Sequence, residues 1–346
     1  MNTRLQKIKR ILLYLIGNYI ENEMIFKQKQ KRGISMPNKT DWFYNKKWGV
    51  FVHYLYVAQN NPLLSCNMGV GETDWNECVN SFDVDLLAKQ LHEAGAGYLF
   101  ITLLQRKRFM CAPNSAFDRI TGYKPGEACS KRDLIGDIYN ALQKYNIDLM
   151  LYFTGDGPLD DPKAGPAMGY VSQSEKVSLP YVKNWAEVAA EYSRRYGKKV
   201  KGWWVDGCYS FIGYDEEKLK IIADALREGN PDALISLNGS VEPRVSAYSI
   251  SDDFTTGEMN NFVDIPDQRF IGGAQWHTLS FLGIPLDGVK NNGWCKPGSK
   301  YSGEYMRKYV NKVHDHGGVV TIDICLNRDG SIDKEQLEVL KQINTI

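Results

Sequence analysis

This sequence has no excess of positive or negative charge. Its 346 residues carry 42 Lys and Arg against 41 Asp and Glu, a net charge of +1 at pH 7, and no long run of one sign interrupts the balance. Partners recognised mainly by charge, above all nucleic acids, usually require a strongly basic face. We therefore expect no nucleic-acid partner and favour a neutral or small ligand.

Paired cysteines are also lacking. The seven Cys residues form an odd set, and no two of them are spaced as C-x-x-C. This argues against a disulfide scaffold and a zinc ribbon, and we expect reduced thiols and a cytoplasmic location. The cluster His314-Asp315-His316 could bind a metal, but it falls where a helix is predicted to end. We expect neither a metal nor a cofactor.

Long hydrophobic runs are missing as well. The apolar run 11–16 is far shorter than the ~20 residues that span a bilayer, so we expect no membrane partner. It follows a basic patch, as in a signal peptide of a periplasmic protein, but it is too short and no A-x-A-like site follows. Residues 31–33 would be encoded by purine-rich codons, like a bacterial ribosome-binding sequence. We expect translation from Met36, with residues 1–35 an extension and 36–346 one domain.

Apolar side chains are abundant enough for a large core, because 43% of the residues are hydrophobic and 12% are aromatic. Short apolar runs alternate with segments of helical period, which is typical of βα units. Several runs are apolar on both alternating faces, as in a parallel sheet covered on both sides. The eight predicted strands are 48–55, 97–103, 148–153, 200–205, 233–237, 247–254, 270–276 and 319–325.

A period of 3.6 residues predicts the helices between these strands. They lie near residues 84–94, 134–142, 185–196, 219–226, 306–313 and 337–343. Ser130-x-x-Asp133 has the form of a capping box, and Gly95 is placed to end the first helix. Eight strands in about 310 residues match a (β/α)8 TIM barrel with a single catalytic domain, and an open doubly wound sheet is the competitor. The phosphate-binding glycine motifs that would favour the open sheet are absent.

In a barrel, the carboxyl ends of the strands meet at one mouth. Carboxylates, amides, histidines and aromatic residues follow the predicted strands there. Two carboxylates among indole rings suit cleavage of a glycosidic bond, which needs one ionised group, one proton donor and flat apolar surfaces. The sharpest feature is Gly202-Trp203-Trp204-Val205-Asp206-Gly207, in which a strand ends on an acid. Asp206 could equally cap the following turn, with the tryptophans in the core.

The segment Trp42-Phe43-x-x-Lys46-Lys47-Trp48-Gly49-Val50-Phe51-Val52-His53 resembles the opening W-F-x-x-x-K-F-G-I-F-I-H-W-G of the α-L-fucosidase family of glycoside hydrolases. The similarity continues through residues 82–96, 130–134, 151–154, the W-x-D-G around Asp206, and 317–331. It covers about residue 41 to the C-terminus. It implies a retaining, exo-acting glycosidase on a (β/α)8 barrel, with carbohydrate as its partner.

The resemblance also implies catalytic roles. Asp206 stands at the position of the family's nucleophile. Residues 253–258 resemble the family's D-F-x-T-P-E stretch, which makes Glu258 the best candidate for the acid/base. Other members use a Trp-Glu pair further along the chain, which corresponds here to Trp276-His277, so His277 is an alternative proton donor.

This sequence departs from the family at the residues that would hold the sugar. The family's His-His-Asp-Gly-Phe is replaced by Gln105-Arg106-Lys107-Arg108-Phe109, and no C-terminal β-sandwich is predicted. The resemblance therefore does not carry over fucose as the sugar, since lost hydrogen-bonding groups change specificity strongly. Arg106 would suit a carboxylate, sulfate or phosphate on the substrate, or be a solvated loop residue. The substrate-binding candidates are His53, Trp75, Gln105, Arg106, Tyr152, Trp204, Trp276 and His277.

Two other interpretations stay open. A barrel that has lost its reaction could bind carbohydrate only, stacking sugars on Trp75, Trp204 and Trp276. The same acid pair could instead serve another reaction, such as elimination from an oxidised sugar. The oligomeric state is not predicted.

Overall fold

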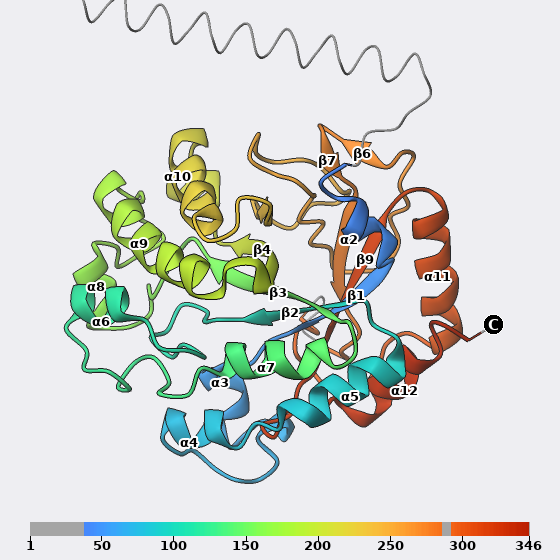
Figure 1. Cartoon of the computed structure of the whole chain (residues 1–346), viewed down its shortest axis with the longest axis horizontal. Helices are drawn as coiled ribbons and strands as arrows, with labels where there is room; N and C mark the ends of the chain where they lie inside the picture. Colours follow the sequence, from blue (N-terminus) through green and yellow to red (C-terminus); the bar gives the residue numbers. More distant parts are fainter. Residues whose placement is uncertain (1–37, 286–291, 346) are drawn as a thin grey trace, which may run out of the picture. The chain divides into compact units, whose positions relative to one another are not determined.

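The computed structural model describes residues 38–285 and 292–345, so the expected extension 1–35 lies outside the described residues. The core of the fold is a seven-stranded parallel sheet in the order β5-β4-β3-β2-β1-β9-β8 (Figure 1). Its strands are β1 Trp48–Val52, β2 Tyr98–Thr102, β3 Asp148–Thr154, β4 Val200–Asp206, β5 Leu234–Leu237, β8 His277–Phe281 and β9 Val319–Ile324.

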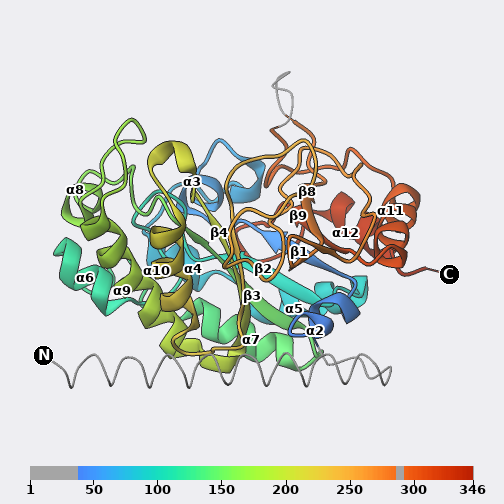
Figure 2. The same cartoon turned by 90° about the horizontal axis from the view of Figure 1, so that it is seen from above.

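Helices pack around the outside of this sheet (Figure 2). The α-helices are α2 Asp41–Asn45, α3 Tyr56–Gln59, α4 Trp75–Asn80, α5 Val84–Ala94, α6 Ser115–Thr121, α7 Leu134–Gln143, α8 Ala164–Met168, α9 Leu179–Tyr196, α10 Glu216–Arg227, α11 Gly303–Asp315 and α12 Lys334–Lys341. The short 3-10 helices are η1 Ser65–Asn67, η2 Gly197–Lys199 and η3 Ser210–Ile212. Within the described residues, none of the helices has the length and apolar character needed to cross a bilayer.

All six helices predicted from the 3.6-residue period are confirmed as α5, α7, α9, α10, α11 and α12. Gly95 ends α5 in the left-handed conformation, with φ of 80°, as expected for a C-terminal glycine. The predicted capping box is wrong in detail. The Asp133 carboxylate caps α7 by accepting from the Gly136 amide, whereas the Ser130 hydroxyl donates to the Arg132 carbonyl.

Six of the predicted strands match β1, β2, β3, β4, β5 and β9, but the other two predictions are wrong. Residues 247–254 form no strand. Residues 270–276 instead form a small antiparallel hairpin, β6 Phe270–Ile271 with β7 Ala274–Gln275, and the sheet strand is the next segment, β8. The hairpin forms because Gly272 and Gly273 both adopt positive φ, 56° and 91°, which a two-residue hairpin turn requires.

An irregular segment, residues 253–259, lies between β5 and β8. The Asp253 amide donates to the Ile235 carbonyl on one side at 2.8 Å, and the Leu279 amide donates to the Gly257 carbonyl on the other at 2.8 Å. The described sheet therefore contains seven regular strands, and this segment bridges its two outer strands, by a main-chain hydrogen bond to β5 and by the isolated parallel pair Glu258–Leu279 to β8.

Alternation along the strands creates two separate cores. Val50 and Val52 face the helices, in one cluster of buried side chains, whereas Phe51 faces the inside of the curled sheet with Phe100 and Trp204. Since side chains two residues apart share a face, the inward set continues beyond Phe51 to His53 and beyond Trp204 to Asp206. The site is thus an extension of the inner core at the carboxyl ends of the strands.

Candidate active site

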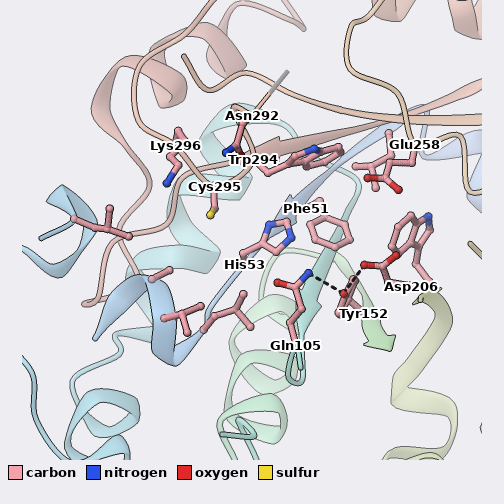
Figure 3. Close-up of a pocket in the computed structure, with 16 residues that line it drawn as sticks. Phe51, His53, Gln105, Tyr152, Asp206, Glu258, Asn292, Trp294, Cys295 and Lys296 are labelled. Atoms are coloured by element: carbon pink, nitrogen blue, oxygen red, sulfur yellow. Dashed lines mark hydrogen bonds between the residues drawn. The ribbon is translucent and has the colours of Figure 1, made fainter. Parts of the chain in front are cut away.

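A cavity of about 310 Å³ opens at the carboxyl ends of the strands (Figure 3). Six of the residues predicted from the sequence to form the site line it. They are His53, Gln105, Tyr152, Trp204, Asp206 and Glu258. They come from β1, the segment after β2, β3, β4 and the bridging segment 253–259, so distant parts of the chain converge here.

The Asp206 carboxylate is held by neutral donors. Its Oδ1 accepts from the Gly207 amide at 2.8 Å, the Tyr209 hydroxyl at 3.0 Å and the Asn238 side-chain amide at 3.0 Å. Within residues 38–285 and 292–345, its Oδ2 accepts only from the Tyr152 hydroxyl, at 2.8 Å, and the carboxylate forms no ion pair. Oδ2 thus has fewer partners there than Oδ1.

Tyr152 is itself oriented by a second side chain. Gln105 Nε2 donates to the Tyr152 hydroxyl at 3.2 Å, and that hydroxyl in turn donates a hydrogen bond to Asp206 (Figure 3). Burial and the charge of Asp206 hold the pKa of Tyr152 well above its usual value. Tyr152 thus stays a neutral donor to the carboxylate over the whole working range of pH.

Glu258 has the opposite electrostatic character. Burial, followed by the negative charge of Asp206, raises its pKa to about 8, although the hydrogen bond from Asn238 acts in the opposite direction. Glu258 therefore carries a proton at neutral pH. A carboxyl that keeps its proton at neutral pH is what a general acid requires.

One side-chain amide connects the two acids. Asn238 Nδ2 donates to Asp206 Oδ1 at 3.0 Å and to Glu258 Oε2 at 2.6 Å. Its Oδ1 accepts from the Ser240 amide at 3.2 Å, which fixes the orientation of the side chain. The two carboxyl oxygens can be no further apart than the sum of the two bonds to that nitrogen. This upper limit is compatible with the ~5–5.5 Å of retaining glycosidases and is shorter than the ~6.5–9.5 Å of inverting ones.

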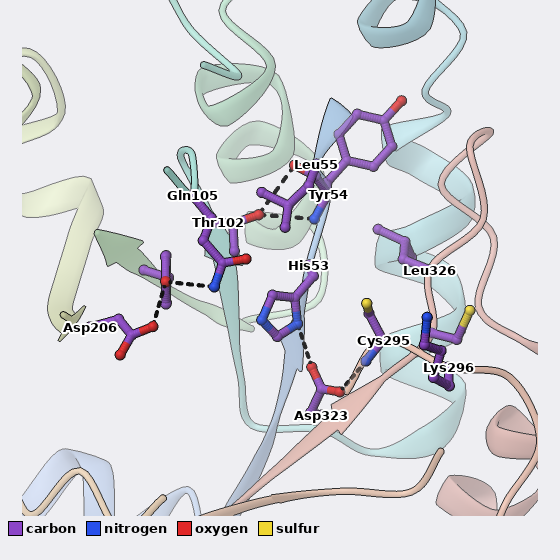
Figure 4. A network of polar contacts seen from close by, with 12 residues as sticks. His53, Tyr54, Leu55, Thr102, Gln105, Asp206, Cys295, Lys296, Asp323 and Leu326 are labelled. Carbon is purple, nitrogen blue, oxygen red and sulfur yellow. Dashed lines mark hydrogen bonds and ion pairs between the residues drawn. The ribbon is translucent and has the colours of Figure 1, made fainter. Parts of the chain in front are cut away.

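On another side of the cavity, His53 is fixed by Asp323. His53 Nδ1 lies 2.7 Å from Asp323 Oδ2, and Asp323 Oδ1 accepts from the Cys295 amide at 2.8 Å (Figure 4). Burial raises the pKa of Asp323, and His53 partly offsets that effect. The pairing orients the ring, so that Nε2 remains free to bind a substrate hydroxyl.

The structure does not bring Trp75 or Arg106 to the cavity wall. Trp75 is 3% exposed, and its indole Nε1 donates to the Met110 carbonyl at 2.9 Å within the outer core. The Arg106 guanidinium forms two bonds to Asp160, at 2.9 and 2.8 Å, with Asp156 3.9 Å away. Arg106 is thus already neutralised by acids of its own chain.

The predicted placement of Trp276 and His277 at the carboxyl end of a strand is wrong, because β8 begins at His277. Both side chains therefore lie at the amino end of the sheet, and the His277 ring contacts Phe43 of α2 with 5.5 Å between ring centres. His277 is fully buried, with its ring nitrogens 2.7 Å from the Thr255 carbonyl and 2.6 Å from the Thr321 hydroxyl. Burial lowers its pKa to about 4.

Several cavity residues were not among the candidates from the sequence. Trp294, Cys295 and Lys296 line the wall opposite Asp206, and the Tyr209 hydroxyl donates to Asp206. Asn238, by contrast, was expected among the polar residues at the strand ends, and it bonds both acids. The first three lie between β8 and α11, where the sequence has no clear period, and only an isolated Trp in a polar segment marked them. In the part of the chain that the structure describes, no cluster of three metal-binding side chains occurs.

A parallel sheet surrounded by helices, with an acid pair over a cavity of this size, is typical of glycoside hydrolases. The model of the family described as alpha-L-fucosidase matches residues 72–345. The chain belongs to the α-L-fucosidase family. The matched region starts after the opening motif 42–53 and includes Asp206 and Glu258.

Solved structures support the same fold. An endo-fucoidan hydrolase of glycoside hydrolase family 107 is 15% identical over 87% of this chain and 92% of its own, with a TM-score of 0.62. Alpha-L-fucosidase AlfC from Lactobacillus casei, in complex with its α-L-fucose product, is 17% identical over 89% and 97%, with a TM-score of 0.60. A Bacteroides thetaiotaomicron α-L-fucosidase, trapped as a covalent intermediate, is 17% identical over 89% and 74%, with a TM-score of 0.59. No curated protein matches the sequence significantly.

Proposed function

We propose that this protein is a retaining, exo-acting glycoside hydrolase that cleaves an α-L-fucoside or a closely related glycoside. The observation that carries the proposal is the single Asn238 nitrogen that bonds both Asp206 and Glu258, at 3.0 and 2.6 Å. It holds the Asp206 carboxyl beside Glu258, whose pKa is raised, over the cavity.

In the first step, Asp206 Oδ2 attacks the anomeric carbon, and Glu258 gives its proton to the leaving oxygen as the glycosidic bond breaks. This forms an ester between Asp206 and the sugar and releases the aglycone as an alcohol. In the second step, Glu258 takes a proton from water, whose oxygen attacks the anomeric carbon and releases Asp206. Each step inverts the anomeric carbon, so the product retains the starting configuration.

The remaining cavity residues bind the sugar. Trp204 and Trp294 offer flat apolar surfaces to sugar C–H groups, and His53 Nε2 and Gln105 offer polar atoms to its hydroxyls. The family's paired histidines are replaced by Gln105 and Arg106, so we propose a sugar or substitution pattern that differs from unmodified fucose. The fold itself we propose to be a (β/α)8 barrel in which segment 253–259 takes the place of the missing strand.

The test removes the nucleophile and restores it from solution. An Asp206→Gly variant should hydrolyse 4-nitrophenyl α-L-fucoside at least ~10³-fold more slowly than the wild type. Added azide should restore activity and give the β-fucosyl azide, because an external anion then attacks from the side that Asp206 occupied.

Asp224→Gly, at an exposed carboxylate of α10, is the matched control and should respond to azide as the wild type does. Full activity of Asp206→Gly would contradict the assignment. Binding of fucose by the wild type without hydrolysis of any aryl glycoside would favour the carbohydrate-binding alternative.

A further inference from the structure

A positive charge lies at the end of the cavity remote from the acids. Lys296 lines the cavity with Cys295 and Asn292, across His53 and Trp294 from Asp206 (Figure 3). The cavity therefore has an acidic end, where the glycosidic bond is cleaved, and a basic end.

The Lys296 ammonium has no partner among residues 38–285 and 292–345. No hydrogen bond or ion pair of its Nζ occurs there, although the side chain is half-buried. The acids around the cavity form hydrogen bonds with groups other than Lys296. Asp323 bonds His53 and the Cys295 amide, and Asp206 accepts from four neutral donors. By contrast, Arg106, to which the sequence assigned an anion-binding role, is paired with Asp160.

The position of this lysine is fixed by its main chain. The Lys296 amide donates to the Gly293 carbonyl at 3.2 Å, its carbonyl accepts from Gln336 Nε2 at 2.8 Å, and the adjacent Cys295 amide is held by Asp323. The main chain that carries Lys296 is thus anchored to the same carboxylate that orients His53.

A neutral sugar that filled the cavity would remove water from this ammonium and give it no counter-charge, which costs binding free energy. An anionic group on the ligand would restore a charge-assisted hydrogen bond. We infer, resting on the proposed hydrolase function, that Lys296 selects glycosides that carry a carboxylate or a sulfate ester in the part of the cavity beside it.

The experiment compares substrates that differ only in this group. The probes are 4-nitrophenyl α-L-fucoside, its monosulfate esters, and a fucoside whose nitrophenyl group carries a carboxylate. For the wild type, kcat/KM of at least one charged probe should exceed that of the neutral probe by about tenfold or more. Preference for a sulfate ester places the anion on the sugar, and preference for the carboxylated aryl group places it on the leaving group.

The preference should disappear in Lys296→Gln, persist in part in Lys296→Arg, and decline with added salt. Arg106→Gln is the matched control and should leave the ratio unchanged. An equal charged-to-neutral ratio in wild type and Lys296→Gln would overturn the inference.

If no probe is hydrolysed, the proposed function fails and the inference is tested by binding alone. Calorimetry with L-fucose and its sulfate esters then compares wild type with Lys296→Gln. A preference for the ester that is lost in the variant supports the Lys296 site. The absence of such a preference in the wild type overturns it.

Discussion

At the scale of single residues, the chemistry depends on two acids made different by their surroundings. Among the described residues, the Asp206 carboxylate accepts from four donors, whereas the Glu258 side chain accepts from one and has its pKa raised, first by desolvation. Sequence reasoning named both residues from their positions in motifs. It could not give their protonation states, because these depend on burial and on the distance between the two side chains.

The pH dependence of kcat/KM should report the proton on Glu258. Its raised pKa of about 8 means that it is protonated below that pH and loses its proton as the pH rises through that value. With 4-nitrophenyl α-L-fucoside, or the fastest related substrate, kcat/KM should therefore fall on the alkaline side with a midpoint near 8. In Glu258→Gln this alkaline limb should vanish together with most of the activity. A profile that stays flat to pH 10 would contradict the role of Glu258.

Replacing Asn238 should move this alkaline limb. The Asn238 amide stabilises the ionised form of Glu258, so Asn238→Ala should raise the pKa of Glu258 and move the midpoint to higher pH. The rate should also fall by about 10- to 100-fold, because a buried hydrogen bond to a charged group is lost. Tyr209→Phe removes a donor from Asp206 only, and its midpoint should change little. A downward shift in Asn238→Ala would contradict this assignment.

At the scale of the elements, the sheet could be predicted wherever short turns separate clear periods. Six strands and six helices follow from the pattern of apolar residues. The strand prediction for 270–276 failed because Gly272 and Gly273 turn the chain back within it. The bridging segment 253–259 has no strand pattern in its sequence. Main-chain hydrogen bonds to β5 and β8 set its register, and such bonds leave no trace in the order of side chains.

That bridge requires glycine at position 257. Gly257 has φ of 58°, and a Cβ there would lie 2.0 Å from the His277 carbonyl oxygen. Gly257→Ala should therefore lower the free energy of unfolding by about 3 kcal/mol or more, and should displace Glu258 next to it. Gly273→Ala meets the same backbone strain, with φ of 91° but no atom within 4 Å, so it should cost only about 1 kcal/mol. Urea unfolding of both variants checks this, and equal losses would contradict the close contact at Gly257.

At the scale of the whole molecule, the site exists only because the sheet curls. His53 and Asp323 are 270 positions apart in sequence, yet parallel pairing of β1 with β9 makes their contact unavoidable. The resemblance of motifs to the family pointed to Asp206 and Glu258, and the pattern of apolar residues predicted most of the sheet. The Trp294-Cys295-Lys296 wall could not be predicted, because only the folded chain shows that Asp323 holds it beside His53.

The central claim is that Asp206 and Glu258 work as a pair at the spacing of a retaining enzyme. The most direct test is proton NMR of the first sugar released from the best aryl α-L-fucoside, recorded before the anomers equilibrate. A retaining mechanism predicts that the α-anomer appears first and the β-anomer only later, by mutarotation. Initial release of the β-anomer would contradict it.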